Sequence, residues 1–559
     1  MSIVEGATRT YNVADIFELV AETIPDSLAA VAIDERRTYA ELDEQASRFG
    51  RHLVDVGVEP GDHVAIVSWN RIEWLEAMLG CFKARAVPIN VNYRYVDAEI
   101  AYLLENSDAV AVVAEPAFVH RIEGLRADLP LLKAGIALEA NSFSDAADSD
   151  EGQRLPEGWV AWSDALAAAD PAVPFEQRSN DDLYLLYTGG TTGMPKGVMW
   201  RLEDIFFAAF GGGRPGGEPI TTPEQICEVV SETPADERWA PNVVTSPMMH
   251  GNGQWNTFMP LLSGRGVVYW CEHRFDAGRI AALAEAEQAR LLVLVGDGMA
   301  RPFADHLAAS PGAHDLSGLA MILSGGAILS ASLKAELAQH LPDVLIVDGF
   351  GASETGGNGA LVDPGTETGR PRFNMGPHTT VLDEDLEPME AGTGEPGMLA
   401  RSGHIPLGYY KDEAKTAKTF PTSPSGTRWA VPGDQAILEA DGTITLLGRG
   451  SNCINTGGEK VFPEEVEIAL KSLPDVAEAF VVGVPHERFG SAVTAVVEPK
   501  PGATPDLETI RAGLRDTLAG YKLPRGLVVV DKLSYTGAGK PDYKWAKAQA
   551  AEASASIDG

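Results

Sequence analysis

The sequence predicts a protein of the α/β class, with a large amino-terminal domain of layered sheets and helices and a small carboxy-terminal domain of α+β type. Apolar strands and amphipathic helices alternate along residues 38–92, and apolar strands that end in glycine-rich turns return between residues 291 and 351. Near residue 450 the pattern changes to a separate set of strands and helices, which continues for about a hundred residues. A chain of 559 residues exceeds one ordinary core, so several domains are expected.

A helix is expected over residues 38–57. Thr38 and Glu41 can form a capping box at its start, and Gly57 suits its C-terminal stop. Apolar residues recur along it at steps of four and three, which predicts one buried face, at Leu42, Ala46, Phe49, Leu53 and Val56.

Buried strands and connecting helices follow. Residues 63–67 and 87–92 have the pattern of strands, and the helix between them gives the order that is typical of a parallel sheet. Three more apolar strands that run into glycine-rich turns lie at 291–295, 318–326 and 343–351. Because ligands of open α/β sheets collect at the carboxyl ends of the strands, these turns are where a binding site is expected.

The residues beyond 450 have strands and helices of their own. Strands are expected at 476–484, 492–499 and 526–533, and a helix around 507–520. The segment GRGSN at 448–452 is short and rich in glycine, so it could serve as a hinge between the two domains.

The charge of the chain argues against nucleic acid and anionic membranes as partners. The 80 acidic residues exceed the 44 basic residues, for a net charge of −36, and such a surface repels other polyanions. No transmembrane run of 18 apolar residues and no secretory signal is expected. The four cysteines lack pair spacing, which argues against disulfides or a cysteine zinc site and favours a reducing, cytoplasmic setting.

The segment YTGGTTGMPKGVMW, residues 187–200, has the composition of a phosphate-binding loop. Pro195 precedes Lys196 and a second apolar strand follows, so the segment is a strand–loop–strand hairpin, whereas a Walker loop leads into a helix. Glycines let backbone N–H groups approach anionic oxygens, threonines add hydroxyl donors, and the lysine adds a positive charge. The loop residues concerned are Thr188, Gly189, Gly190, Thr191, Thr192 and Gly193.

This loop resembles the phosphate loop of the AMP-forming adenylating enzymes, the superfamily of acyl-CoA synthetases, luciferase-like enzymes and peptide-synthetase adenylation domains. Residues 348–356, DGFGASETG, resemble the aromatic-Gly-x-Thr-Glu motif of that family. The resemblance implies that Phe350 stacks on adenine, that Ser353 donates to the α-phosphate, and that Glu354 binds Mg²⁺, a hard ion that prefers oxygen ligands. Thr191 is the second expected ligand of the metal.

The remaining nucleotide contacts are implied by segments along the rest of the chain. They are Asp348 and Gly349, the SGGA residues Gly325, Gly326 and Ala327, and the ribose-binding pair Asp434 and Arg449. For the SGGA segment an ordinary turn is the alternative. The resemblance also implies an AMP- and acyl-binding domain at 1–449, with layered α/β sheets and a small β-barrel-like part, and a mobile lid domain at 450–559 with a hinge at about 449–452.

Two matches lie in the expected lid domain. Gly457 and Gly458 would let the backbone approach the pantetheine arm of coenzyme A. Lys540, in TGAGKPDYKWAK, would be the catalytic lysine that bridges the carboxylate and the α-phosphate during adenylation.

His250, in PMMHGNGQW, would stand at the wall between the acyl and thiol pockets, with a plain packing role as the alternative. Peptide-synthetase domains carry an aspartate at the next position to hold the amino group of the substrate. Gly251 stands there in this chain, and a buried ammonium without a counter-ion is costly, so an amino-acid substrate is disfavoured. Room for a bulky apolar acid is suggested by Asn252, Trp255, Gly356 and Gly357.

The sequence therefore predicts an AMP-forming acyl-CoA synthetase that uses ATP, Mg²⁺ and coenzyme A on a fatty acid or a steroid side-chain carboxylate. Its partners are these small molecules, and a homodimer is left open. The alternatives are a ligase that loads a carrier protein, an aryl-acid CoA ligase, a luciferase-like oxygenase and an inactive nucleotide-binding scaffold. Intact Lys196, Glu354, Asp434, Arg449 and Lys540 argue against the scaffold.

Overall fold

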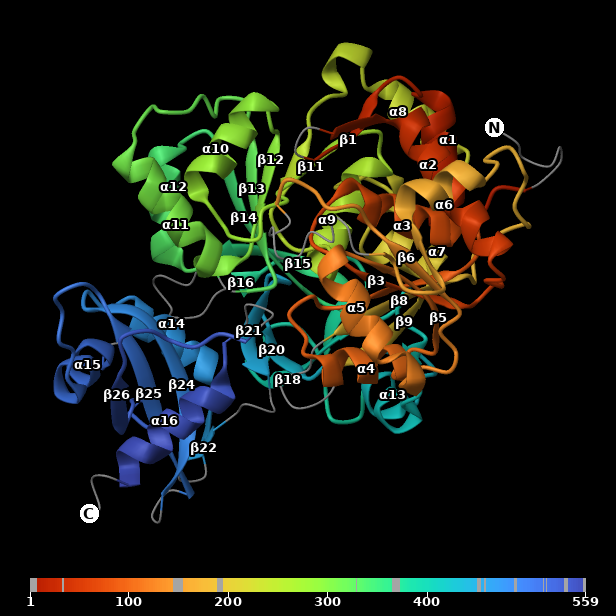
Figure 1. The fold of residues 1–559 in the computed structure, drawn as a ribbon. Helices are drawn as coiled ribbons and strands as arrows, with labels where there is room; N and C mark the ends of the chain where they lie inside the picture. The colour runs from red at the N-terminus through yellow and green to blue at the C-terminus, as the bar shows by residue number, and fades with distance from the viewer. Residues whose placement is uncertain are drawn as a thin grey trace.

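The computed structural model describes residues 8–32, 35–143, 154–188, 195–327, 329–363, 372–449, 454–456, 459–486, 490–515, 517–518, 520–536 and 541–555. It has a large amino-terminal domain with two extended sheets and a small carboxy-terminal domain with a third (Figure 1). No helix within these ranges is long and apolar enough to cross a membrane.

The first sheet has eight strands and is parallel except at one edge. In spatial order they are β19 (Gly408–Tyr409), β9 (Lys196–Arg201), β8 (Leu183–Thr188), β4 (Val87–Asn90), β3 (His63–Val67), β5 (Ala109–Ala114), β6 (Ala134–Ala137) and β7 (Trp159–Ala161). The strands from β8 to β7 are parallel, whereas β9 and β19 add to the edge in antiparallel pairing. The strands at 63–67 and 87–92 are thus confirmed, although β4 ends two residues earlier than expected.

The second sheet has thirteen strands. In spatial order they are β17 (Thr379–Leu382), β18 (Pro396–Arg401), β20 (Asp434–Leu438), β21 (Ile444–Arg449), β16 (Arg372–Phe373), β15 (Gly356–Asp363), β14 (Leu345–Ala352), β13 (Met321–Gly325), β12 (Leu291–Leu294), β10 (Asn242–Val244), β11 (Val267–Tyr269), β1 (Leu28–Ala32) and β2 (Glu35–Thr38). From β14 to β1 the strands are parallel. The strands from β15 to β17 are antiparallel and correspond to the expected barrel-like part, which continues the parallel sheet at β14.

Helices cover the sheets of the amino-terminal domain (Figure 1). They are α1 (Val13–Thr23), α2 (Tyr39–Asp55), α3 (Ile72–Lys83), α4 (Asp97–Asn106), α5 (Pro116–Gly124), α6 (Trp162–Ala168), α7 (Leu202–Ala208), α8 (Gln225–Glu232), α9 (Gly251–Leu261), α10 (Ala277–Ala286), α11 (Gly296–Ala309), α12 (Ala331–His340) and α13 (Glu413–Thr419).

Within its described residues, the carboxy-terminal domain has a five-stranded sheet and three helices. The strands are β23 (Glu459–Val461), β22 (Ile454–Thr456), β25 (Gly490–Pro499), β24 (Val476–His486) and β26 (Gly526–Val529), and the helices are α14 (Pro463–Lys471), α15 (Leu507–Leu514) and α16 (Tyr543–Ala555). The domain meets the larger one through α14, where Lys471 Nζ lies 3.6 Å from Asp297 Oδ2 on the first turn of α11. At the opposite end of α14, a Cβ on Gly448 would lie 2.3 Å from Glu464 Oε2, so the Glu464 side chain of the first helical turn lies directly against this glycine of β21.

Helix α2 confirms the helix expected at 38–57 and corrects one of its residues. The Thr38 side chain accepts a hydrogen bond from Glu41 N in a capping box, and Leu42, Ala46, Phe49 and Leu53 are buried. Val56 is 37% exposed, so its predicted place on the buried face is wrong. The helix ends at Asp55, and Val56 is its C-cap residue. Gly57 then takes φ +84°, and the turn it makes buries Val58 in the core instead of Val56.

Candidate active site

The hairpin predicted around the phosphate loop is present. Strands β8 and β9 pair antiparallel, with Thr188 opposite Lys196, so these two residues lie at the base of the loop. Gly189, Gly190, Thr191, Thr192 and Gly193 lie outside the described residues. The hairpin is fastened by Asn90, which accepts from Tyr187 N (2.7 Å) and donates to Tyr187 O (2.8 Å) at the end of β4. Strands β4 and β8 pair only at Ile89 and Leu185, and the side chain of Asn90 provides the next link between them.

Lys196 is held by an acidic residue that lies 216 positions further along the chain. Its ammonium forms an ion pair with Asp412, and this contact lowers the pKa of the Asp412 carboxyl. Asp412 also caps α13 by accepting a hydrogen bond from Lys415 N at 3.0 Å. The capping sequence DEAK is a local signal for a helix start, but nothing in it indicates a partnership with the phosphate-loop lysine.

Glu354 lies in the turn between β14 and β15, and two other strands fix this turn. Tyr409 of β19 donates a hydrogen bond from its hydroxyl to Glu354 Oε1 at 2.6 Å, and Tyr409 is only 4% exposed. Trp200 of β9 donates from Nε1 to Ser353 O at 3.0 Å. Because β9 also carries Lys196, the hydrogen bond from Trp200 connects the strand of this lysine to the turn with Glu354. The sequence offers no signal that would have found the contact with Tyr409.

The turns with the expected purine contacts lie side by side at the carboxyl ends of two parallel strands. The register of β13 and β14 places Gly325 opposite Gly349. Asn252 of α9 donates to Gly325 O at 3.3 Å, so the helix that follows His250 reaches the same edge. Gly326 is exposed and has φ +89°, a conformation that favours glycine. The next residue, Ala327, is half-buried. Phe350 packs its ring against Phe373 with 4.8 Å between centroids.

Asp348 is a buried carboxyl on β14 with 8% exposure. Burial raises its pKa to about 7, although a backbone hydrogen bond from Leu329 and the nearby Lys334 oppose the shift. At neutral pH a large share of Asp348 therefore carries its proton in the folded protein.

Asp348→Asn should make the stability of the protein less dependent on pH between 4.5 and 8. An unfolded aspartate loses its proton near pH 4, whereas the folded carboxyl keeps it until about pH 7, so the free energy of unfolding of the wild type falls as pH rises through this window. Asparagine does not ionise, so the variant should gain up to about 3 kcal/mol relative to wild type between the two pH values. Urea unfolding at both pH values measures the difference. Asp343→Asn, at an exposed carboxylate just before β14, is the control, and equal pH slopes for all three proteins would contradict a protonated Asp348.

The expected ribose pair is brought together by strand pairing. Asp434 and Arg449 lie directly opposite each other on β20 and β21, and Gly433 with φ +105° precedes the aspartate. The residues at 450–453, with most of the expected hinge, lie outside the described residues, and so do Gly457, Gly458 and Lys540. Their placement stays a prediction.

His250 is the N-cap residue of α9, and its neighbour Met249 accepts a hydrogen bond from Asn90 at 2.7 Å. Asn90 thus links this residue to the phosphate hairpin. A Cβ on Gly251 would lie 2.9 Å from Leu186 Cδ2 and 3.3 Å from Trp255, so this position faces apolar side chains.

One expectation about the acyl pocket is wrong. Gly356 does not provide room, because a Cβ there would lie 2.6 Å from Ala208 O, so the absence of a side chain allows the turn to pack on α7. At Gly357 the nearest atom to a Cβ lies 3.9 Å away, so only this second glycine leaves space.

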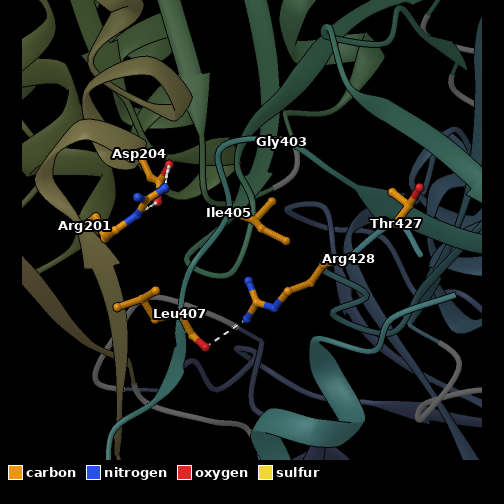
Figure 2. Close-up of a pocket in the computed structure, with 7 residues that line it drawn as sticks. All are labelled: Arg201, Asp204, Gly403, Ile405, Leu407, Thr427 and Arg428. Atoms are coloured by element: carbon orange, nitrogen blue, oxygen red, sulfur yellow. Dashed lines mark hydrogen bonds and ion pairs between the residues drawn. The ribbon is translucent and has the colours of Figure 1, made fainter. Parts of the chain in front are cut away.

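A cavity of about 400 Å³ lies at the end of β9 that carries Arg201 (Figure 2). It is lined by Arg201, Asp204, Gly403, Ile405, Leu407, Thr427 and Arg428. Arg201 forms a paired contact with Asp204, and Arg428 donates to Leu407 O at 2.8 Å. Arg201 lies five positions after Lys196 on an extended strand, a distance of about 16 Å, so this end of β9 lies away from the phosphate loop.

Comparisons with known proteins agree with this arrangement. Residues 17–410 match the family AMP-binding enzyme, and residues 465–540 match the AMP-binding enzyme C-terminal domain. The medium/long-chain-fatty-acid–CoA/3-oxocholest-4-en-26-oate–CoA ligase of Mycobacterium marinum is 44% identical over 545 residues, with 96% of each chain covered. The 3-oxocholest-4-en-26-oate–CoA ligase of Rhodococcus rhodochrous is 43% identical over 547 residues, again with 96% of each covered.

Solved structures share the fold. The anthranilate CoA ligase AuaEII in complex with anthranoyl-AMP has a TM-score of 0.81 at 22% identity, covering 99% of this chain and 100% of that one. ATP-bound MatB from Rhodopseudomonas palustris has a TM-score of 0.76 at 25% identity, with 95% and 98% covered. The chain therefore belongs to the AMP-binding enzyme family, in its branch of AMP-forming CoA ligases.

Proposed function

We propose that this enzyme activates a fatty acid or a steroid side-chain carboxylate with ATP and transfers the acyl group to coenzyme A. The observation that carries the proposal is that the phosphate-loop lysine, the expected metal ligand and the expected purine contacts are linked by hydrogen bonds and strand pairing. Trp200, on the strand of Lys196, and Tyr409 both bond the turn that carries Glu354. That turn follows β14, where Gly349 lies opposite Gly325, and Asn252 bonds Gly325. The relatives named above act on such acids, and the apolar surroundings of Gly251 suit an acid without an amino group.

In the first half-reaction the carboxylate of the acid attacks the α-phosphorus of ATP, an acyl-adenylate forms, and pyrophosphate leaves. The protein contributes mainly position and charge. Lys196 would leave Asp412 and bind the pyrophosphate oxygens, while the glycine and threonine donors of its loop, Thr188 to Gly193, surround the same group. Phe350 and the edge glycines would hold the adenine, Ser353 would donate to the α-phosphate, and Asp434 with Arg449 would hold the ribose.

The residues around Glu354 fit a magnesium ion. The carboxylate is fixed by Tyr409 in a turn beside the expected phosphate positions, and Mg²⁺ prefers such oxygen ligands together with phosphate oxygens. Bound there, with Thr191 as the second expected protein ligand, the ion would neutralise part of the phosphate charge. Lys540 would approach the same oxygens from the lid domain.

In the second half-reaction the thiol of coenzyme A attacks the adenylate carbonyl and AMP leaves. We propose that the domain at 450–559 turns about 449–452 between the two steps, withdrawing Lys540 and bringing Gly457 and Gly458 to the site. His250 would then line the passage between the acyl and thiol sites. The contact between Lys471 and Asp297 would have to break in such a movement. We assign the reaction to the cytoplasm, the reducing compartment that the unpaired Cys81, Cys227 and Cys271 suit.

A pyrophosphate-release assay over a panel of acids, with and without coenzyme A, tests the proposal. Medium- and long-chain fatty acids and a steroid side-chain acid should release pyrophosphate, and with coenzyme A they should give the thioester. Release with aryl acids alone would favour the aryl-acid ligase. Release without thioester would favour a carrier-protein ligase, or an oxygenase if oxygen is consumed, and no acid-dependent release would leave only the scaffold.

A further inference from the structure

Two histidines and a glutamate meet at a place that the adenylating reaction does not use. His306 lies in the last turn of α11, His314 in the segment that leads from α11 to β13, and Glu285 in α10. The two imidazoles face each other with 3.2 Å between their Nε2 atoms. The other ring nitrogen of His314, Nδ1, lies 3.3 Å from Glu285 Oε2. The cluster is partly buried, with 17% of the His314 side chain exposed.

Helix α10 is shaped to hold this pair. A Cβ on Gly278 would lie 2.9 Å from His306 Cε1, so the imidazole of His306 rests against the helix where a side chain is missing. Glu285 follows Gly278 by seven residues, which is two helical turns, so both are on the same face of α10. The ring of His306 is therefore held by packing and the ring of His314 by a carboxylate.

The separation of the two nitrogens suits a shared metal ion. Bonds from zinc to imidazole nitrogen are about 2.0–2.1 Å long, and two such bonds to atoms 3.2 Å apart enclose an angle of about 100–105°, close to tetrahedral. A carboxylate that accepts Nδ1–H of His314 leaves the lone pair on Nε2, the atom that faces His306. This pairing of carboxylate with histidine recurs around zinc, where it orients the ligand and strengthens its binding.

We propose that His306 and His314 bind one divalent first-row transition metal ion of the kind that imidazole prefers, such as Zn²⁺, and that Glu285 orients His314 for this role. No group of three or more His, Cys, Asp or Glu side chains within the described ranges is arranged to hold a metal, so water would complete the coordination. Gly296 begins α11, and its N–H donates to the Ser324 side chain, next to the expected purine contacts at Gly325 and Gly326. His306 lies ten positions further along the helix, about 15 Å from Gly296, so the two histidines lie away from the expected nucleotide site. The ion would therefore join α10, α11 and the following segment without taking part in the reaction.

Titration of the metal-stripped full-length protein with ZnCl₂ at pH 7.5, followed by calorimetry, tests the site. Wild type should bind one more Zn²⁺ than His306→Gln or His314→Gln. Glu285→Gln should keep the stoichiometry and bind about 10–100-fold more weakly. His340→Gln removes an exposed histidine at the end of α12 and should behave as wild type. The melting temperature of wild type and of His340→Gln should rise with added Zn²⁺, and that of the two site variants should rise less.

Equal stoichiometry and affinity in wild type and both site variants would overturn the proposal and leave only a hydrogen bond between the two rings. Equal losses in His340→Gln would also overturn it, because binding would then follow the number of histidines and not their arrangement. Wild-type affinity in Glu285→Gln would overturn the role of the carboxylate. His306→Gln removes a ring that packs on α10, so this variant could fail to fold. In that case His314→Gln, which changes a residue outside the helices, tests whether the two histidines bind the metal.

Discussion

Lys540→Ala should slow adenylate formation by about 10²–10³-fold and leave thioester formation from a supplied acyl-adenylate within a few-fold of wild type. The first step places new negative charge on the α-phosphate, and one preorganised cation there has an effect of this size. In the second step the proposed domain movement has withdrawn Lys540 from the site, so its loss should have little effect there. Pyrophosphate release measures the first step, and acyl-CoA formation from synthetic acyl-adenylate measures the second.

Lys540 lies outside the described residues, and helix α16 begins at Tyr543, shortly after it. The exposed Lys544 on that helix offers the matched control, and Lys544→Ala should leave both half-reactions unchanged. Equal loss of both half-reactions in Lys540→Ala would contradict the two-orientation mechanism, because the lysine would then act in both steps or hold the domain together.

Glu354→Gln should lower the rate of pyrophosphate release at saturating Mg²⁺ by about 10²–10³-fold, since the amide is a poor ligand for a hard cation. Tyr409→Phe should have a smaller effect of about tenfold, seen mainly as a higher Mg²⁺ concentration for half-maximal rate. The variant removes the hydroxyl that donates a hydrogen bond to the Glu354 carboxylate, and a hydrogen bond to a charged group contributes about 1.5–3 kcal/mol.

Tyr410 provides the control for this prediction. It follows Tyr409 directly and donates to another carboxylate, Asp108 Oδ2, also at 2.6 Å. Tyr410→Phe therefore removes a hydroxyl of the same kind without touching Glu354, and it should keep the wild-type Mg²⁺ dependence. If the two phenylalanine variants show the same Mg²⁺ curve, Tyr409 does not position the metal ligand.

Local patterns allowed several elements of the fold to be predicted. The capping box of Thr38 and Glu41 is a contact over three residues, and the periodic apolar residues of α2 follow from helical geometry. The hairpin of β8 and β9 followed from Pro195 and from an apolar strand where a Walker loop has a helix. Val56 and Gly356 were misjudged because their surroundings are set by a turn and by α7, which residue spacing does not encode.

By itself, the sequence determined the class of fold, the order of its motifs and the family, because each depends on residue types at short spacing. Only the tertiary structure decided that Asp412 holds Lys196, that Tyr409 fixes Glu354, and that Asn90 ties the hairpin to the segment of His250. These partners lie 216, 55 and 159 residues apart. Contacts of this kind arise when separate strands pair at one edge of a sheet, and a single sequence carries no local signal of which polar side chains will meet there.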